Sequence, residues 1–198
     1  MTNNNNPLFS VQPAVSADGT LTYTPAGSTG VATVSVRIHD NGGTANGGSD
    51  LSAVQTFTIT ITADTTGPTG GSVDASGLVG TGARYAASTT LSLNLAKGTD
   101  PNGVAATGNL LKRATATLTS GGTANGTCGA FGSYTLVSGG ADPVSPKSDT
   151  VADQACYSYQ YVVLDTLGNS TTYTSPNIKV DLTAPAAPSL AHSAFTNT

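Results

Sequence analysis

The chain contains two cysteines, Cys128 and Cys156, whose type and spacing point to a definite chemistry. They lie 28 positions apart (156 minus 128), and in a chain rich in threonine and serine such a pair predicts a disulfide. On the chain-entropy model, closing a loop of that size stabilises a domain by roughly 3 to 4 kcal/mol. Two free thiols are one alternative. A nucleophilic thiolate is another, but it needs a base, and the two histidines, His39 and His192, lie in other parts of the chain.

Oxygen-bearing side chains form a second set of candidates, because all 11 acidic residues are aspartates. Calcium binds carboxylate, amide and backbone carbonyl oxygens, so aspartates and asparagines in loops are suitable ligands. The candidates are Asp40, Asn41, Asn46, Asp50 and Asp64, followed later in the chain by Asp165, Asn169 and Asp181. The Asp-x-x-Gly-Asn sequence at 165–169 is also typical of a plain hairpin turn, in which Asp and Asn bond their own backbone. Both interpretations stay open.

The strands that must position these residues are indicated by apolar side chains that alternate with threonine and other polar residues. This pattern occurs at residues 20–24, 33–39 and 56–62, and it is typical of antiparallel strands with one face in water. A short strand at 8–11 brings the number before residue 64 to four. Because a β-sandwich of the expected kind usually needs about seven strands, we expect the first module to be incomplete and to lack its N-terminal strands.

The second part of the chain predicts a complete all-β module. Its expected strands are residues 71–74, 89–95, 113–119, 133–137, 155–165 and 170–181. The loops between them, such as Asp100-Pro101-Asn102-Gly103, carry residues that tolerate tight turns. A single helical turn is expected at 109–112. An antiparallel β-sandwich follows from this order of elements.

One face of the longest expected strand carries Tyr157, Tyr159, Tyr161 and Val163 at alternate positions. An aromatic stripe of this kind either fills the core between two sheets or stacks on sugar rings at a surface. The core interpretation is favoured, because the chain has no tryptophan, the residue that usually provides the best sugar platform.

Two acidic junctions that end in proline divide the chain, Asp64-Thr65-Thr66-Gly67-Pro68 and Asp181-Leu182-Thr183-Ala184-Pro185. Proline cannot donate a hydrogen bond to a strand ladder, so each junction marks the end of a module. We therefore expect a partial module at 1–64, a complete module at 65–181, and a linker with the first strand of a further repeat at 182–198.

Several of these segments resemble tandem repeats of large bacterial surface proteins of the adhesin type. Residues 8–13, 18–26 and 55–62, with the strand that leads into Asp40-Asn41-Gly42-Gly43, are similar to the later part of a cadherin-like or immunoglobulin-like repeat. Residues 69–181 are similar to a bacterial immunoglobulin-like (fibronectin III-like) repeat, through Cys128-Gly129, the Tyr-rich strand after Cys156, and Asp165 to Asn169. The resemblance implies tandem antiparallel β-sandwiches. It also implies calcium at the module junctions, with Asp40 and Asp64 the best individual ligands.

Composition excludes some functional classes. Only 9% of the residues are charged and the net charge is −4, so neither a nucleic-acid backbone nor an anionic membrane surface is an expected partner. No apolar stretch is long enough for a transmembrane helix. No catalytic constellation of carboxylates, histidines or cysteines is evident, so we do not expect an enzyme.

The leading functional hypothesis is a non-enzymatic, extracellular structural module of a repetitive bacterial surface protein, such as an adhesin stalk, a fibre or a matrix component. Its partners would be neighbouring repeats of the same protein. One alternative is a filament subunit that self-associates by strand exchange, with residues 189–195 as the donated strand. Another is a spacer or carbohydrate-binding region of a secreted enzyme.

Overall fold

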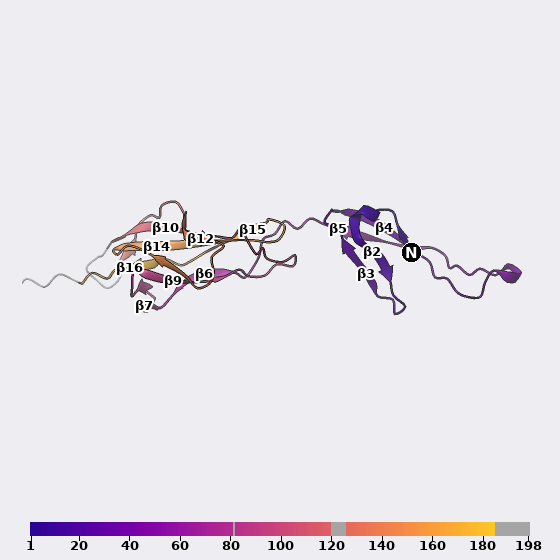
Figure 1. Ribbon diagram of the computed structural model, residues 1–198, viewed down its shortest axis with the longest axis horizontal. Helices are drawn as coiled ribbons and strands as arrows, with labels where there is room; N and C mark the ends of the chain where they lie inside the picture. The colour runs from indigo at the N-terminus through magenta and orange to yellow at the C-terminus, as the bar shows by residue number, and fades with distance from the viewer. Residues whose placement is uncertain (81, 120–125, 185–198) are drawn as a thin grey trace, which may run out of the picture. The chain divides into compact units, whose positions relative to one another are not determined.

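A computed structural model describes residues 1–80, 82–119 and 126–184, and the chain divides into two compact units, Met1–Asp64 and Thr65–Thr198 (Figure 1). We describe each unit by itself. In the described residues every regular element longer than three residues is a β-strand, and all strand pairs except one are antiparallel. The predicted all-β class is therefore confirmed.

The first unit consists of a three-stranded sheet and a hairpin. The sheet has the order β1 (Thr2–Asn3), β4 (Gly30–Val36), β5 (Gln55–Ile61), and the hairpin joins β2 (Phe9–Val15) to β3 (Leu21–Pro25). Two short 3-10 helices, η1 (Asn6–Leu8) and η2 (Ala45–Gly47), lie in the connections. The unit has five strands, one more than the four expected. The additional strand is β1, which could not be predicted because it is only two residues long and shows no alternation.

The apolar side chains that alternate with polar ones in β4 and β5 form part of the small core of the first unit. Ala32 and Val34 are fully buried, and Ile59, which pairs with Ala32, is 6% exposed. These side chains pack with Leu8 and Phe9. Burial of apolar area supplies most of the stabilisation of such a unit, and here few side chains contribute to it.

The second unit contains two sheets. The larger has the order β11 (Thr127–Cys128), β10 (Leu110–Thr119), β14 (Ala155–Leu164), β16 (Ile178–Val180), β8 (Tyr85–Ala86), β7 (Leu78–Val79), with β12 (Thr135–Ala141) paired to β10 and β15 (Ser170–Thr174) paired to β14. The smaller has the order β13 (Lys147–Thr150), β9 (Thr90–Ala96), β6 (Ser72–Ser76). The one parallel pair joins β16 to β8.

Both sheets of the second unit contribute to one hydrophobic core. Leu91 and Leu93 come from β9 of the smaller sheet, and they share a cluster with Leu111 of β10, Tyr159 of β14 and Ile178 of β16 in the larger sheet. A core shared between the inner faces of two sheets is the arrangement of a β-sandwich. It supports the sandwich interpretation of this unit.

Two expectations about the second unit are wrong in detail. The helical turn expected at 109–112 is instead the start of strand β10, which pairs with β14 from Leu110 onward. The single strand expected at 170–181 is divided into β15 and β16. Pro176 lies in the break, and proline cannot continue a ladder as a hydrogen-bond donor. Ser175, beside it, accepts a hydrogen bond from the Tyr159 backbone N–H at its side-chain oxygen, at 2.9 Å.

Candidate functional site

The two cysteines form a disulfide, as predicted. The Sγ atoms of Cys128 and Cys156 are 2.02 Å apart, and the Cα atoms are 5.7 Å apart. Cys128 lies in β11, opposite Leu118 of β10, and Cys156 lies in β14, where it is fully buried against Ala116 and Leu118. Because both cysteines of the chain are bonded, neither is available as a nucleophile while the disulfide is intact.

The tyrosine stripe of β14 fills the core, which is also as predicted. Tyr157, Tyr159, Tyr161 and Val163 are each at most 2% exposed. Buried aromatic rings with a polar end usually find a hydrogen-bond partner, and the Tyr157 hydroxyl donates to the Ala152 carbonyl at 3.0 Å and accepts from its N–H at 2.9 Å. These rings are therefore not available to stack on a sugar.

A polar network inside the second unit was not foreseen from the sequence. The Tyr159 hydroxyl donates to Asp149 Oδ2 at 2.7 Å, and Arg113 Nη1 donates to the same oxygen at 2.8 Å. Asp149 is 9% exposed, and the Arg113 guanidinium also lies over the Tyr157 ring, 5.5 Å from its centroid. The network depends on the pairing of β10 with β14, which places Arg113 opposite Tyr159. The sequence could have indicated it only if this register had been known.

The environment of this network keeps Tyr159 protonated. Burial, together with the hydrogen bond to Asp149 and the charge of Asp149, raises the pKa of Tyr159 well above its ordinary value of 10, against the weaker opposing effect of Arg113. A protonated tyrosine that donates to an aspartate already paired with an arginine has no free role as an acid or base. We assign the network a structural role.

The raised pKa of Tyr159 predicts a loss of stability at alkaline pH. Because the pKa in the folded state lies above that in the unfolded state, this contribution is complete below about pH 10 and is lost as the pH rises toward the folded-state pKa. The free energy of unfolding of the wild type and of Tyr159→Phe can be measured by denaturation between about pH 8 and about pH 11. It should decline more steeply with pH for the wild type. Equal slopes would contradict the burial of this hydroxyl.

Asp165 and Asn169, two of the calcium candidates, form a tight turn between β14 and β15. Asp165 Oδ1 accepts the N–H groups of Leu167 and Asn169, each at 2.8 Å, and Oδ2 accepts from Asn169 Nδ2 at 2.7 Å. Asp165 is 2% exposed. The turn interpretation thus accounts for both residues through hydrogen bonds to their own segment.

Asp100, which the sequence places only in a turn, lies beside Asp165. Carboxylate oxygens of the two residues lie within 4.8 Å of each other. Two oxygens bound to one calcium ion at 2.3 to 2.6 Å can be at most about 5 Å apart, so this spacing suits the ion. Asp100 Oδ1 also accepts the Asn102 N–H at 2.8 Å, as in an ordinary turn. Calcium at this place is a prediction. Chemical-shift changes at the Leu167 amide on addition of calcium chloride would test it.

Acid should loosen the Asp165 turn. Burial alone would raise the pKa of Asp165, but the hydrogen bonds from Asn169 and Leu167 outweigh it, and the pKa is lowered from its ordinary value of 3.8. The stabilisation is therefore complete above the ordinary pKa and is lost as the pH falls through the lower, folded-state value. We expect the melting temperature of the wild type to exceed that of Asp165→Asn near neutral pH, and the difference to shrink below about pH 4. A difference that does not depend on pH would contradict this account.

The other calcium candidates are placed as follows. Asp40 Oδ1 accepts the Gly42 N–H at 2.9 Å, and Asp50 Oδ2 lies 3.0 Å from His39 Nε2. Asn41 is exposed, and the Asn46 side chain lies outside the described part of the chain. Asp40 and Asp50 are neighbours through a backbone hydrogen bond of 3.0 Å. In the described residues neither Asp40 nor Asp50 belongs to a group of three carboxylate, imidazole or thiol side chains.

The remaining two candidates lie at the predicted ends of the two modules. Asp64 is the last residue of the first unit. Asp181 follows β16, and its Oδ1 accepts a hydrogen bond from the Gln154 side chain. Asp153, which no sequence pattern singles out, binds the same segment: its carboxylate accepts hydrogen bonds from the Leu182 N–H at 2.8 Å and from the Thr183 hydroxyl at 2.9 Å. The Leu182 hydrogen bond is the main cause that lowers the pKa of Asp153.

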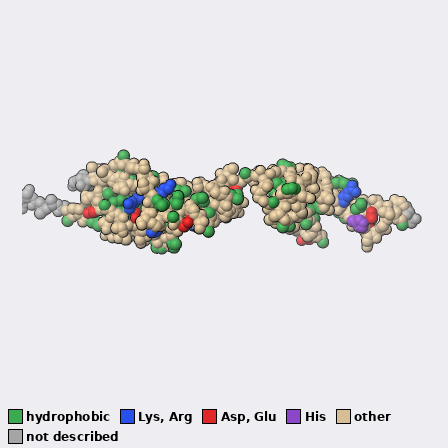
Figure 2. Space-filling model, turned by 45° about the horizontal axis from the view of Figure 1, so that its top comes forward, with side chains coloured by type: hydrophobic (Ala, Val, Ile, Leu, Met, Phe, Trp, Pro, Cys, Tyr) green, Lys and Arg blue, Asp and Glu red, His purple; other side chains and the backbone are tan. Residues whose placement is uncertain are grey.

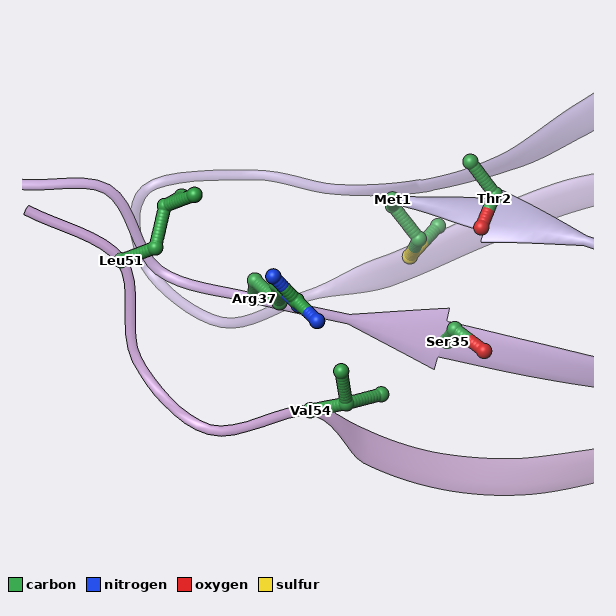
Figure 3. A pocket seen from close by; sticks show the side chains of 6 residues that line it. All are labelled: Met1, Thr2, Ser35, Arg37, Leu51 and Val54. Atoms are coloured by element: carbon green, nitrogen blue, oxygen red, sulfur yellow. The ribbon is translucent and has the colours of Figure 1, made fainter.

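A shallow hollow lies at one end of the sheet of the first unit (Figure 3). Its volume is about 490 Å³, and it is lined by Met1, Thr2, Ser35, Arg37, Leu51 and Val54. The lining side chains offer one cation, two hydroxyl groups and no carboxylate, imidazole or thiol.

The surface of each unit is mainly polar and uncharged. On the faces seen in Figure 2, charged side chains are sparse among hydroxyl, amide and backbone groups. In the described residues no helix is long and apolar enough to cross a membrane. No protein-family model matches the chain, and no curated protein or solved structure is significantly similar to it.

Proposed function

We propose that the chain is a non-enzymatic structural segment of a repetitive extracellular surface protein, built from immunoglobulin-like β-sandwich modules. The disulfide between Cys128 and Cys156 is the observation that carries this proposal. Structural disulfides persist in oxidising compartments outside the cytosol. This disulfide joins strands β11 and β14 beside a buried cluster, so it belongs to the framework of the second unit.

The exposed faces of the strands support a structural role outside the cell. In β10 the exposed residues Thr115, Thr117 and Thr119 alternate with the buried residues Ala116 and Leu118. Such a face is hydrated through hydroxyl groups and not through charges, which suits a segment that repeats along a fibre without charge repulsion between its modules.

The polar groups of the second unit support a non-catalytic function. Tyr159 and Arg113 both donate hydrogen bonds to Asp149, and Asp165 accepts hydrogen bonds within its own turn. Perturbed acids and bases often mark active sites, but structural networks perturb them too. Here Tyr159 and Asp165 each have hydrogen-bond partners that fix a strand or a turn, which suits a structural β-module.

The strand order of the second unit supports the immunoglobulin-like assignment. Strand β14 pairs with β10 on one side and with β15 and β16 on the other, and β16 pairs in parallel with β8. Two packed sheets, with a core that includes aromatic residues from a central strand such as β14, are features of this architecture.

Immunogold labelling tests the proposal. Antibodies raised against the purified chain should label the outer surface of intact source cells, and treatment with an external protease should remove the label. Label that appears only after the cells are permeabilised, or only over the cytoplasm, would contradict the proposal.

A further inference from the structure

Strand β5 of the first unit has one edge without a partner strand among the described residues. It pairs with β4 along its whole length, from Gly30 opposite Ile61 to Val36 opposite Gln55, without a shift in register. All of its residues are uncharged, none is proline, and only Ile59 is buried. A long, regular and uncharged edge presents a row of backbone donors and acceptors that another strand can bind.

Most other edge strands of the chain carry features that discourage pairing, and among the described strands the five-residue β15 is the exception. Strand β6 contains Asp74, and β13 contains Lys147 and Asp149. Strand β2 has two shifts in register and β3 ends at Pro25, while β1, β7 and β11 are only two residues long. Charges, prolines, irregularities and shortness are the usual protections of an edge. Strand β5 has none of them.

We propose that β5 is a self-association site, at which the β5 strands of two copies of this chain pair antiparallel around a two-fold axis. The full overlap of residues 55 to 61 centres the pair on Thr58, because (55 + 61)/2 is 58. Thr58 then faces Thr58 of the second copy. The inference does not depend on the proposed extracellular function, since it needs only the exposed edge.

The side chains of β5 favour this register. Phe57 is 37% exposed although it lies on the same face as the core residue Ile59. In the proposed pair Phe57 of each copy lies opposite Ile59 of the other, and aromatic with β-branched residues form favourable cross-strand pairs. A shift by one residue would place Phe57 opposite Thr58 and mix the apolar and hydroxyl faces.

Charge at the two ends of β5 selects the antiparallel orientation. Arg37 follows Val36, which pairs with Gln55, so this cation lies at the end where β5 begins. Asp64 follows the other end of β5. A two-fold antiparallel pair brings the cationic end of one copy to the anionic end of the other, whereas a parallel pair would bring Asp64 beside Asp64, because the two β5 strands are neighbours and Arg37 follows β4, one strand further out. Like charges near each other destabilise a strand pair.

The interface is small, so we expect weak association. One added strand of seven residues buries far less than the roughly 1,600 Å² of a standard protein interface. Pairing should therefore be concentration-dependent, and it would become strong only where many copies are held close together.

Sedimentation equilibrium of the full chain, from low micromolar to near-millimolar concentration, tests the proposal. We expect reversible dimers for the wild type. Thr58→Lys places two ammonium groups opposite each other and should raise the dimer dissociation constant about fivefold or more. The matched control is Thr115→Lys, at an exposed threonine of β10, a strand that pairs with β14 on one side and with β11 and β12 on the other. It should dimerise as the wild type does.

Cross-linking provides a second measurement that does not depend on the stability of the lysine variant. Thr58→Cys should form an intermolecular disulfide under mild oxidation, since directly opposite Cβ atoms lie about 4.5 to 5.5 Å apart. Thr56→Cys should not, because the proposed register separates the two Thr56 positions by four residues, or about 13 Å. A wild type that stays monomeric, equal dimerisation of the two lysine variants, or equal cross-linking of the two cysteine variants would overturn the proposal.

Discussion

Replacement of both Cys128 and Cys156 by alanine should lower the free energy of unfolding of the second unit by about 3 to 4 kcal/mol. The disulfide closes a loop with a sequence separation of 28, and the chain-entropy model gives a loss of this size when such a constraint on the unfolded chain is removed. The melting temperature should fall by roughly 10 °C or more. Guanidinium denaturation followed by tyrosine fluorescence measures the change, because the chain has no tryptophan.

The wild type in reductant provides the matched control for the double alanine variant. Cys156 is fully buried beside Ala116 and Leu118, so alanine fits there without burying a polar group. The reduced wild type and the double variant should therefore unfold at similar denaturant concentrations. A change below about 1 kcal/mol in both would show that the disulfide does not constrain the unfolded chain as the model requires.

Replacement of Asp149 by alanine should be the most damaging single substitution of a charged residue, with a cost of about 3 kcal/mol or more. The change leaves the buried Tyr159 hydroxyl and the partly buried Arg113 guanidinium without their shared acceptor. Removal of one partner of a buried pair is costly because the other polar groups remain desolvated. Tyr159→Phe should cost only about 1 to 2 kcal/mol, since the ion pair survives.

A second ion pair of the same unit provides the control for Asp149. Arg84 binds Asp74, but the two side chains are 29% and 45% exposed. An exposed pair contributes at most about 1 kcal/mol, so Asp74→Ala should have a small effect. If Asp74→Ala and Asp149→Ala destabilise the unit equally in denaturation experiments, burial is not the reason for the importance of Asp149.

The alternation of apolar and polar residues predicted the larger strands well, and the exceptions have physical causes. The tyrosines of β14 lie at alternate positions and are buried as expected, although Cys156 and Ser158 between them are buried too. Strand β13, with the sequence Lys-Ser-Asp-Thr, escaped detection because its inward residue is Asp149, which is satisfied by Arg113 and not by apolar contacts. The start of β10, residues 110–112, was expected to be a helical turn because Leu110 and Leu111 are adjacent apolar residues, which do not show the alternation of a strand.

Pairing between distant segments sets another limit on what the sequence can predict. The parallel pair of β16 with β8 joins Lys179 to Tyr85, and β8 is only two residues long, so no local pattern marks it. The candidate site could be predicted from the sequence only in part. The disulfide followed from composition and cysteine count, whereas the proximity of Asp100 to Asp165 depends on two loops that meet only in the folded unit.

Disulfide mapping of the protein from its own cells tests the central claim, that this is an extracellular module with a disulfide framework. Trypsin cuts after Arg113, Lys147 and Lys179, so Cys128 and Cys156 fall in the separate peptides 114–147 and 148–179. In material alkylated at lysis without reductant, mass spectrometry should find these peptides joined, and they should separate on reduction. Recovery of both peptides as alkylated free thiols would place the protein in a reducing compartment and contradict the account.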